Sequence, residues 1–80
     1  MDNLLNKIIR LDNGESYVTL DYISYEGITY FLGNGVIDNK LNEDLVIFKV
    51  QKEGEEYNFF IEPNLEICQK VIEKLEEKNK

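Results

Sequence analysis

Two runs of β-branched and aromatic residues, 16–25 and 28–32, stand on either side of Glu26-Gly27. Apolar and polar positions alternate through much of the first run, as in a half-buried strand. Gly27 can adopt the positive φ that a two-residue turn needs to match the twist of the flanking strands. The stretch 15–34 therefore predicts a β-hairpin, and the other elements can be placed around it.

The first strand of this hairpin changes its apolar parity partway along. The side chains expected to face inward fall first on even positions and then on odd ones: Val18, Leu20 and Tyr22, then Ile23 and Tyr25. A strand cannot exchange its faces in this way without an extra residue or burial on both sides. We therefore predict a β-bulge near 21–23.

The second strand of the hairpin, 28–32, is apolar on both faces apart from Thr29, which favours a central place in a sheet. The glycines of Gly33-Asn34-Gly35 are expected to end it. A polar connection then continues to about Glu43, and we expect it to be the longest irregular stretch of the chain. Long loops often carry function, although a plain surface loop is the simpler interpretation.

Two more strands follow this connection. Residues 45–51 begin as a run that is apolar on both faces, and 56–61 alternate in the manner of a half-buried strand. Glu53-Gly54 is expected to turn the chain between them. Pro63 ends the last strand, because proline has no N–H for the ladder, and it suits the start of a helix.

The C-terminal segment predicts an amphipathic helix. Its apolar side chains fall at helical spacing along one arc: Leu65, Cys68, Val71, Ile72 and Leu75. The opposite face is charged. We expect Leu65, Ile72 and Leu75 to pack on the sheet.

Residues 4–11 allow two interpretations. Leu4, Leu5, Ile8 and Ile9 would share one face of a helix. The alternative is a strand from about Lys7, and we favour it because it leads directly into Asp12-Asn13-Gly14, a sequence typical of hairpin turns.

These elements predict one α+β domain over residues 1–80. It would be a small antiparallel β-meander of about five strands, with the C-terminal helix packed on one face.

Charge narrows the choice of partners. The chain has 9 basic and 16 acidic residues, a net charge of −7. Most of the excess lies in 11–66, which carries three lysines against twelve acids. An acidic body repels phosphate backbones, so we expect no direct binding to DNA or RNA. The plain interpretation of this net charge is solubility, and the alternative is attraction to a basic surface on another protein.

The compartment is expected to be the cytoplasm. A single cysteine cannot form an intramolecular disulfide, which fits a reducing environment. The sequence has no apolar run long enough for a membrane span, and residues 1–10 lack the pattern of a secretory signal.

Little in the sequence points to catalysis. Histidine, the commonest general base, is absent, and Cys68 lies on the apolar helix face, where cysteine usually acts as a small hydrophobe. Gly33-Asn34-Gly35 lacks the third glycine of a dinucleotide site, and 38–44 does not match a calcium loop. We predict a protein that is not an enzyme and has no cofactor and no metal.

The five tyrosines allow two interpretations as well. Tyrosine is favoured in half-buried strands and also at protein interfaces. The plain interpretation is cross-strand packing, and the alternative is a sheet face offered to a partner with acids around it. The candidate partner-binding residues are Asp38, Glu43, Asp44, Glu53, Glu55, Glu56, Tyr17 and Tyr25.

Four features together resemble the YrzB-like small acidic bacterial proteins. They are Asp-Asn-Gly-Glu at 12–15, Tyr-Ile-Ser-Tyr-Glu-Gly-Ile-Thr-Tyr at 22–30, Val-Ile-Phe-Lys-Val at 46–50 before a Glu-rich turn, and the closing helix. The resemblance covers roughly 8–76. It implies a domain family of unknown function, so no catalytic residue carries over.

Two functions remain as hypotheses. The first is a non-enzymatic protein-interaction module of a bacterial cytoplasm, which binds through the sheet face or an edge. The second is an acidic inhibitor, encoded by a phage or mobile element, that blocks a nucleic-acid-binding protein of the host. The partner in either case is another protein, with a homodimer as a further alternative. Salt dependence separates the two hypotheses, because an electrostatic mimic loses its partner steeply as salt rises.

Overall fold

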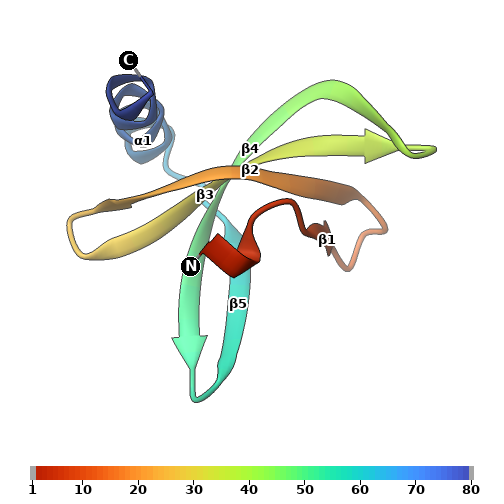
Figure 1. The fold of residues 1–80 in the computed structure, drawn as a ribbon, viewed down its shortest axis with the longest axis horizontal. Coiled ribbons are helices and arrows are strands. Elements are labelled where there is room, and N and C mark those ends of the chain that lie inside the picture. The colour runs from red at the N-terminus through yellow and green to blue at the C-terminus, as the bar shows by residue number, and fades with distance from the viewer. Residues whose placement is uncertain (1, 80) are drawn as a thin grey trace.

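The computed structural model describes residues 2–79, apart from the side chain of Asp2. It has one five-stranded antiparallel sheet and one C-terminal helix, which confirms the predicted α+β class (Figure 1). Neighbours in the chain are neighbours in the sheet. The strands are β1 (Ile8–Arg10), β2 (Ser16–Tyr25), β3 (Ile28–Ile37), β4 (Lys40–Glu53) and β5 (Glu56–Ile61). A 3-10 turn, Asp2–Leu4, precedes them, and the helix is α1 (Leu65–Lys78).

The hairpin predicted around Glu26-Gly27 is confirmed. Tyr25 pairs with Ile28 across a two-residue turn, and the turn residues have φ values of 50° and 79°. Positive φ at both positions gives the turn the same twist as the strands.

The polar connection predicted from 33 to 43 is wrong, because these residues form a second long hairpin. Residues 33–35 lie inside β3, and β4 begins at Lys40. The turn between them is Asp38-Asn39, with φ values of 51° and 64°. Asp and Asn tolerate left-handed φ better than other non-glycine residues, so this pair can make the turn without glycine.

Gly33 stays in the strand because of a close approach. A Cβ atom at this position would lie 2.6 Å from Cε2 of Phe48 and 3.3 Å from Cγ2 of Val46. The glycine therefore leaves room for the buried Phe48 ring, which is one recognised use of glycine inside a strand.

Asn34 and Asn42 supply side-chain hydrogen bonds where the pairing of β3 with β4 is irregular. The pairing of β3 with β4 shifts register between Asn34 and Val36. Asn34 Nδ2 donates to the carbonyl oxygen of Asn42 at 2.8 Å, and Asn42 Oδ1 accepts from the backbone N–H of Asp44 at 2.8 Å. Side-chain amides thus satisfy backbone groups that the ladder leaves unpaired.

The β-bulge in β2 exists, and it lies just before the predicted site. The register with β3 shifts between Thr19 and Asp21, at Leu20. The predicted inward set is wrong in its first half: Tyr17 and Thr19 are buried, whereas Leu20 is exposed. The extra residue then returns Tyr22 to the face of Tyr17.

One face of the curled sheet holds an aromatic core. Its buried members are Tyr17, Phe31, Phe48 and Val50. The Phe48 ring meets the rings of Tyr17 and Phe59 edge to face, with centroids 5.7 Å and 5.9 Å apart. Figure 1 shows the strong curl that folds β5 and the N-terminal segment round this face.

The other face carries a second core under α1. Its buried members are Tyr30, Ile47, Val71 and Leu75. Adjacent positions in β3 and β4 therefore serve opposite cores: Tyr30 and Phe31 in one strand, Ile47 and Phe48 in the next. Burial on both faces explains why these strands lack polar alternation, and it confirms the central place predicted for 28–32.

The strand interpretation of the N-terminal segment is confirmed, although β1 has only three residues. Thr19, which is fully buried, holds the segment in place. Its hydroxyl donates to the carbonyl oxygen of Leu4 at 2.6 Å and accepts from the N–H of Lys7 at 3.0 Å.

Helix α1 begins after an asparagine cap. Asn64 Oδ1 accepts from the N–H groups of Glu66 and Ile67 at 2.9 Å and 3.4 Å. Pro63 lies just before the cap, so it ends the preceding strand segment without being the first helical residue.

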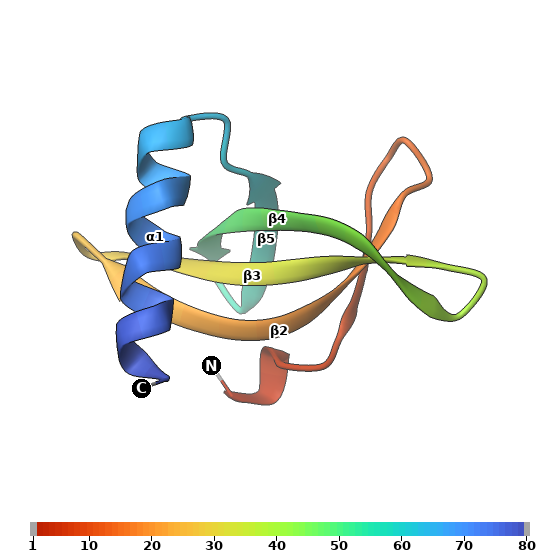
Figure 2. The same ribbon diagram turned by 90° about the horizontal axis from the view of Figure 1, so that it is seen from above.

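The helix covers only part of its face of the sheet, and two of its predicted contacts are wrong. Val71 and Leu75 are buried, but Leu65 is 82% exposed and Ile72 is 40% exposed. The apolar arc read from the sequence is therefore wider than the stripe that the sheet buries. Figure 2 shows α1 across one end of the sheet, with the β3–β4 hairpin extending away from it.

Leu75→Ala should lower the free energy of unfolding by about 2–5 kcal/mol, because it removes buried methyl groups and leaves a cavity. Leu65→Ala, on the same helix, is the matched control and should change it by no more than about 0.5 kcal/mol. Urea titration followed by circular dichroism measures both. Equal losses would mean that α1 is rotated relative to the arrangement described here.

Candidate protein-binding site

An apolar groove lies between α1 and β4, on the side of the helix that faces the β3–β4 hairpin. It consists of two hollows, of about 250 Å³ and about 320 Å³, that share Leu32, Leu45 and Ile72. The first also includes Ile61 and Leu65, and the second continues along the helix to Glu76 and Asn79. We call this feature the α1–β4 groove.

The groove gathers four exposed apolar side chains in one place. Leu45 is 59% exposed and Ile61 46%, and on the helix Leu65 is 82% exposed and Ile72 40%. Scattered apolar residues on a surface are normal, but a contiguous group marks an interaction surface more often. The floor belongs to the core under α1, because Ile47 is buried there and Leu32 packs against it.

The groove has acidic ends. Glu62 lines the first hollow, and Asp21 and Glu76 line the second, while neither hollow has a lysine or arginine in its lining. A bound segment would therefore meet apolar side chains in the middle and carboxylates at both ends.

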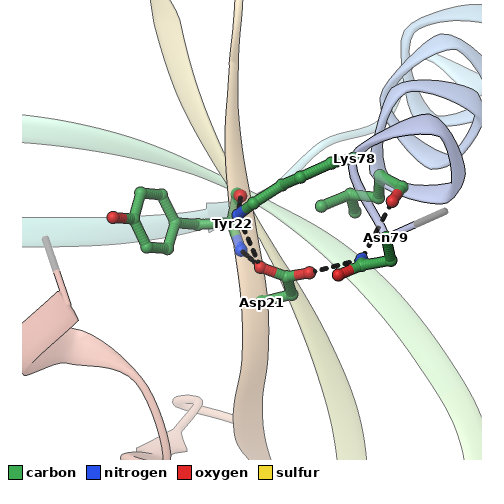
Figure 3. Close-up of polar contacts among 5 residues, drawn as sticks. Asp21, Tyr22, Lys78 and Asn79 are labelled. Carbon is green, nitrogen blue, oxygen red and sulfur yellow. Dashed lines mark hydrogen bonds and ion pairs between the residues drawn. The ribbon is translucent and has the colours of Figure 1, made fainter.

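A polar clamp holds the C-terminal end of α1 to β2 (Figure 3). Lys78 Nζ lies 2.9 Å from Asp21 Oδ1 and donates to the carbonyl oxygen of Tyr22 at 2.8 Å. Asn79 Nδ2 donates to Asp21 Oδ2 at 2.8 Å, and the N–H of Tyr22 donates to Asp21 Oδ1 at 2.8 Å. The clamp thus satisfies backbone groups of β2 and fixes the helix beside the groove.

Asp21 is ionised more readily than an ordinary aspartate. Burial by itself raises its pKa, but the hydrogen bonds from Asn79, Lys78 and the Tyr22 backbone outweigh burial, so the pKa is lowered overall. The clamp therefore contains a stable carboxylate, and Asp21 is already occupied within the protein.

The predicted partner-binding acids lie in two groups at opposite ends of β4. Asp38 and Asp44 line a hollow of about 490 Å³ beside the β3–β4 turn, and Glu43 is next to it in β4. Glu53, Glu55 and Glu56 surround the β4–β5 turn. All six are exposed. Figure 1 shows the two turns pointing in different directions, so the acids form no single patch.

The two tyrosines of the predicted site lie in different surroundings. Tyr17 is buried, and its hydroxyl donates to Glu15 Oε2 at 2.6 Å. This hydrogen bond, together with burial and the charges of Glu15 and Asp44, raises the pKa of Tyr17 to about 12. Tyr17 therefore belongs to the core. Tyr25 is half-buried, and Nζ of Lys74 lies 5.8 Å from the centroid of its ring.

Cys68 is partly buried at the base of the groove. Burial raises the pKa of its thiol, and Sγ donates to the carbonyl oxygen of Glu62 at 3.5 Å. A raised pKa keeps the thiol protonated, which is opposite to what a nucleophile needs. Among residues 2–79, no group of three or more His, Cys, Asp or Glu side chains is arranged to hold a metal ion.

The α1–β4 groove was missed by sequence reasoning. Its helix residues were predicted to pack on the sheet, and Leu45 was assigned to a strand buried on both faces. The available signal was the width of the apolar arc on the helix: Leu65 and Ile72 extend it beyond the stripe that one sheet face can cover.

Comparison with protein-family models, curated proteins and solved structures finds no significant match to the chain. The resemblance to the YrzB-like proteins stays a prediction. Across the described part of the chain, no helix has both the length and the apolar character needed to cross a membrane.

Asp21→Asn should lower stability at pH 7, by no more than about 1 kcal/mol because the pair with Lys78 is partly exposed to solvent. The pKa of Asp21 is lowered in the folded state, so its contribution is complete above the unfolded value of about 3.9 and is lost as pH falls from there through the lower folded value. Urea midpoints at pH 7 and pH 3 test this, with Glu55→Gln as the exposed control. A difference between wild type and Asp21→Asn that is as large at pH 3 as at pH 7 would contradict the clamp.

Proposed function

We propose that this protein is a non-enzymatic interaction module that binds another protein through the α1–β4 groove. The observation that carries the proposal is the contiguous group of exposed apolar side chains over a floor that is packed in the core: Leu45, Ile61, Leu65 and Ile72. A shaped apolar centre with a polar rim is the common anatomy of a protein interface.

The chemistry of the chain supports binding rather than catalysis. The chain contains no histidine, and the pKa shifts of Cys68, Tyr17 and Tyr30 are all upward, away from the activated forms. In this proposal the module acts in a bacterial cytoplasm, which its single free cysteine suits.

The proposal predicts that partner capture depends on the groove. Proteins retained from a bacterial lysate by the immobilised wild type should fall to about one tenth or less with Leu45→Ser or Ile72→Ser, since central apolar contacts dominate most interfaces. Quantitative mass spectrometry of the eluates gives the ratios.

The matched controls are Leu20→Ser and Ile8→Ser, which change exposed apolar side chains that do not line the groove. They should retain the partner at the wild-type level. Circular dichroism must show that all four variants are folded. If the controls lose the partner as fully as the groove variants, or if every variant retains it, the groove does not bind the partner.

The acidic inhibitor is the second candidate, and one observation favours it. Six exposed acids stand at the two ends of β4, spaced along the molecule rather than gathered, as the charges of a nucleic acid are. Repeating the capture at low and high salt separates the candidates. Loss of the partner at high salt, together with full retention by Leu45→Ser at low salt, would favour the inhibitor, whereas a groove-bound partner should depend on Leu45 at either salt.

A further inference from the structure

We propose that the occupant of the α1–β4 groove is a short amphipathic helix, with lysine or arginine near both of its ends, that belongs to another protein. This inference rests on the proposed function and names the class of partner segment.

The spacing of the groove residues on α1 favours a helix as the occupant. The exposed residues of α1 that line the groove recur every seven residues: Leu65, Ile72 and Asn79. This is the seam by which one helix packs along another. From Leu65 to Glu76, the acid at the far end of the groove, the helix rises about 16 Å, which is about three turns of a partner helix.

The backbone around the groove disfavours an extended occupant. At Leu32 and Ile47 the strands β3 and β4 pair with each other, β2 covers the far side of β3, and the Ile47 carbonyl oxygen accepts from the N–H of Glu62 at 2.9 Å. Beside Leu45, where β5 does not pair with β4, Asn42 Oδ1 takes the N–H of Asp44. At the floor of the groove an added strand would find few backbone partners, whereas a helix satisfies its own backbone and binds through side chains.

The acidic residues at the two ends of the groove indicate which charges the ends of the occupant should carry. Glu62 lies at one end of the groove and Glu76 at the other, and Asp21 is already paired with Lys78. Basic residues on the first and last turns of the incoming helix would meet these two carboxylates.

A second copy of this chain fits poorly. In a two-fold interface between two α1 helices packed antiparallel, the Glu62 end of one copy would meet the Glu76 end of the other. Each copy also carries a net charge of −7. Like charges would therefore face each other at both ends of the contact, which favours a basic partner.

The probe is a synthetic peptide of about 12 residues, about 18 Å as a helix, with leucines at heptad spacing and lysines at both ends. Three comparison peptides have glutamates in place of the lysines, a central proline that breaks the helix, or a scrambled order. Fluorescence anisotropy with the full chain measures each dissociation constant, and methyl NMR locates the contact. Analytical ultracentrifugation reports any dimer.

The lysine helix should bind at least about tenfold more tightly than each comparison peptide, and should shift the methyl signals of Leu32, Leu45 and Ile72. Leu45→Ser should weaken it about tenfold, and Leu20→Ser should not change it. The double variant Glu62→Gln, Glu76→Gln should reduce the preference for lysine over glutamate.

If the proline peptide binds as tightly as the lysine helix, the proposal of a helical occupant is wrong. If the glutamate peptide binds as tightly as the lysine helix, the proposal of a basic partner is wrong. A dimer that Leu45→Ser abolishes would assign the groove to a second copy. If no peptide binds the groove while Leu45→Ser still loses the captured protein, the helical occupant is wrong and the interaction module stands. If capture is also independent of Leu45, both proposals fail.

Discussion

The fold depends on one constraint: the central strands β3 and β4 must be covered on both faces at once. Their neighbouring side chains point to opposite sides, with Phe31 and Phe48 in the aromatic core and Tyr30 and Ile47 under the helix. An 80-residue chain has little spare apolar surface, so neither core can be left open to water. The sheet therefore curls over one face, and α1 closes the other.

The α1–β4 groove exists because α1 covers its face of the sheet only in part. One helix of 14 residues cannot span a sheet whose longest strand also has 14, so the apolar surface beside it stays exposed at Leu45 and Ile61. The Asp21 and Lys78 clamp fixes the helix beside that surface. The groove is thus formed by the packing of the fold itself.

Sequence reasoning predicted the elements whose signals are local. The turn at Glu26-Gly27, the strand 56–61 and the existence of the helix each depend on neighbouring residues. It failed where the structure depends on a contact between residues that are far apart in the sequence. Gly33 looks like a strand end, but it stays in β3 because the Phe48 ring occupies the space of its missing side chain. The exposed Leu65 and the α1–β4 groove likewise depend on where the helix lies on the sheet, which periodicity does not specify.

The most direct test of the two-sided constraint is native-state hydrogen exchange. If the two cores depend on each other, the amides of Phe31 in β3 and Val71 in α1 should open with the same free energy, equal to that of global unfolding, and with the same dependence on denaturant. If Val71 exchanges through an opening of much lower free energy while Phe31 keeps the global value, the helix is a separable addition to the sheet, and the constraint described here does not hold.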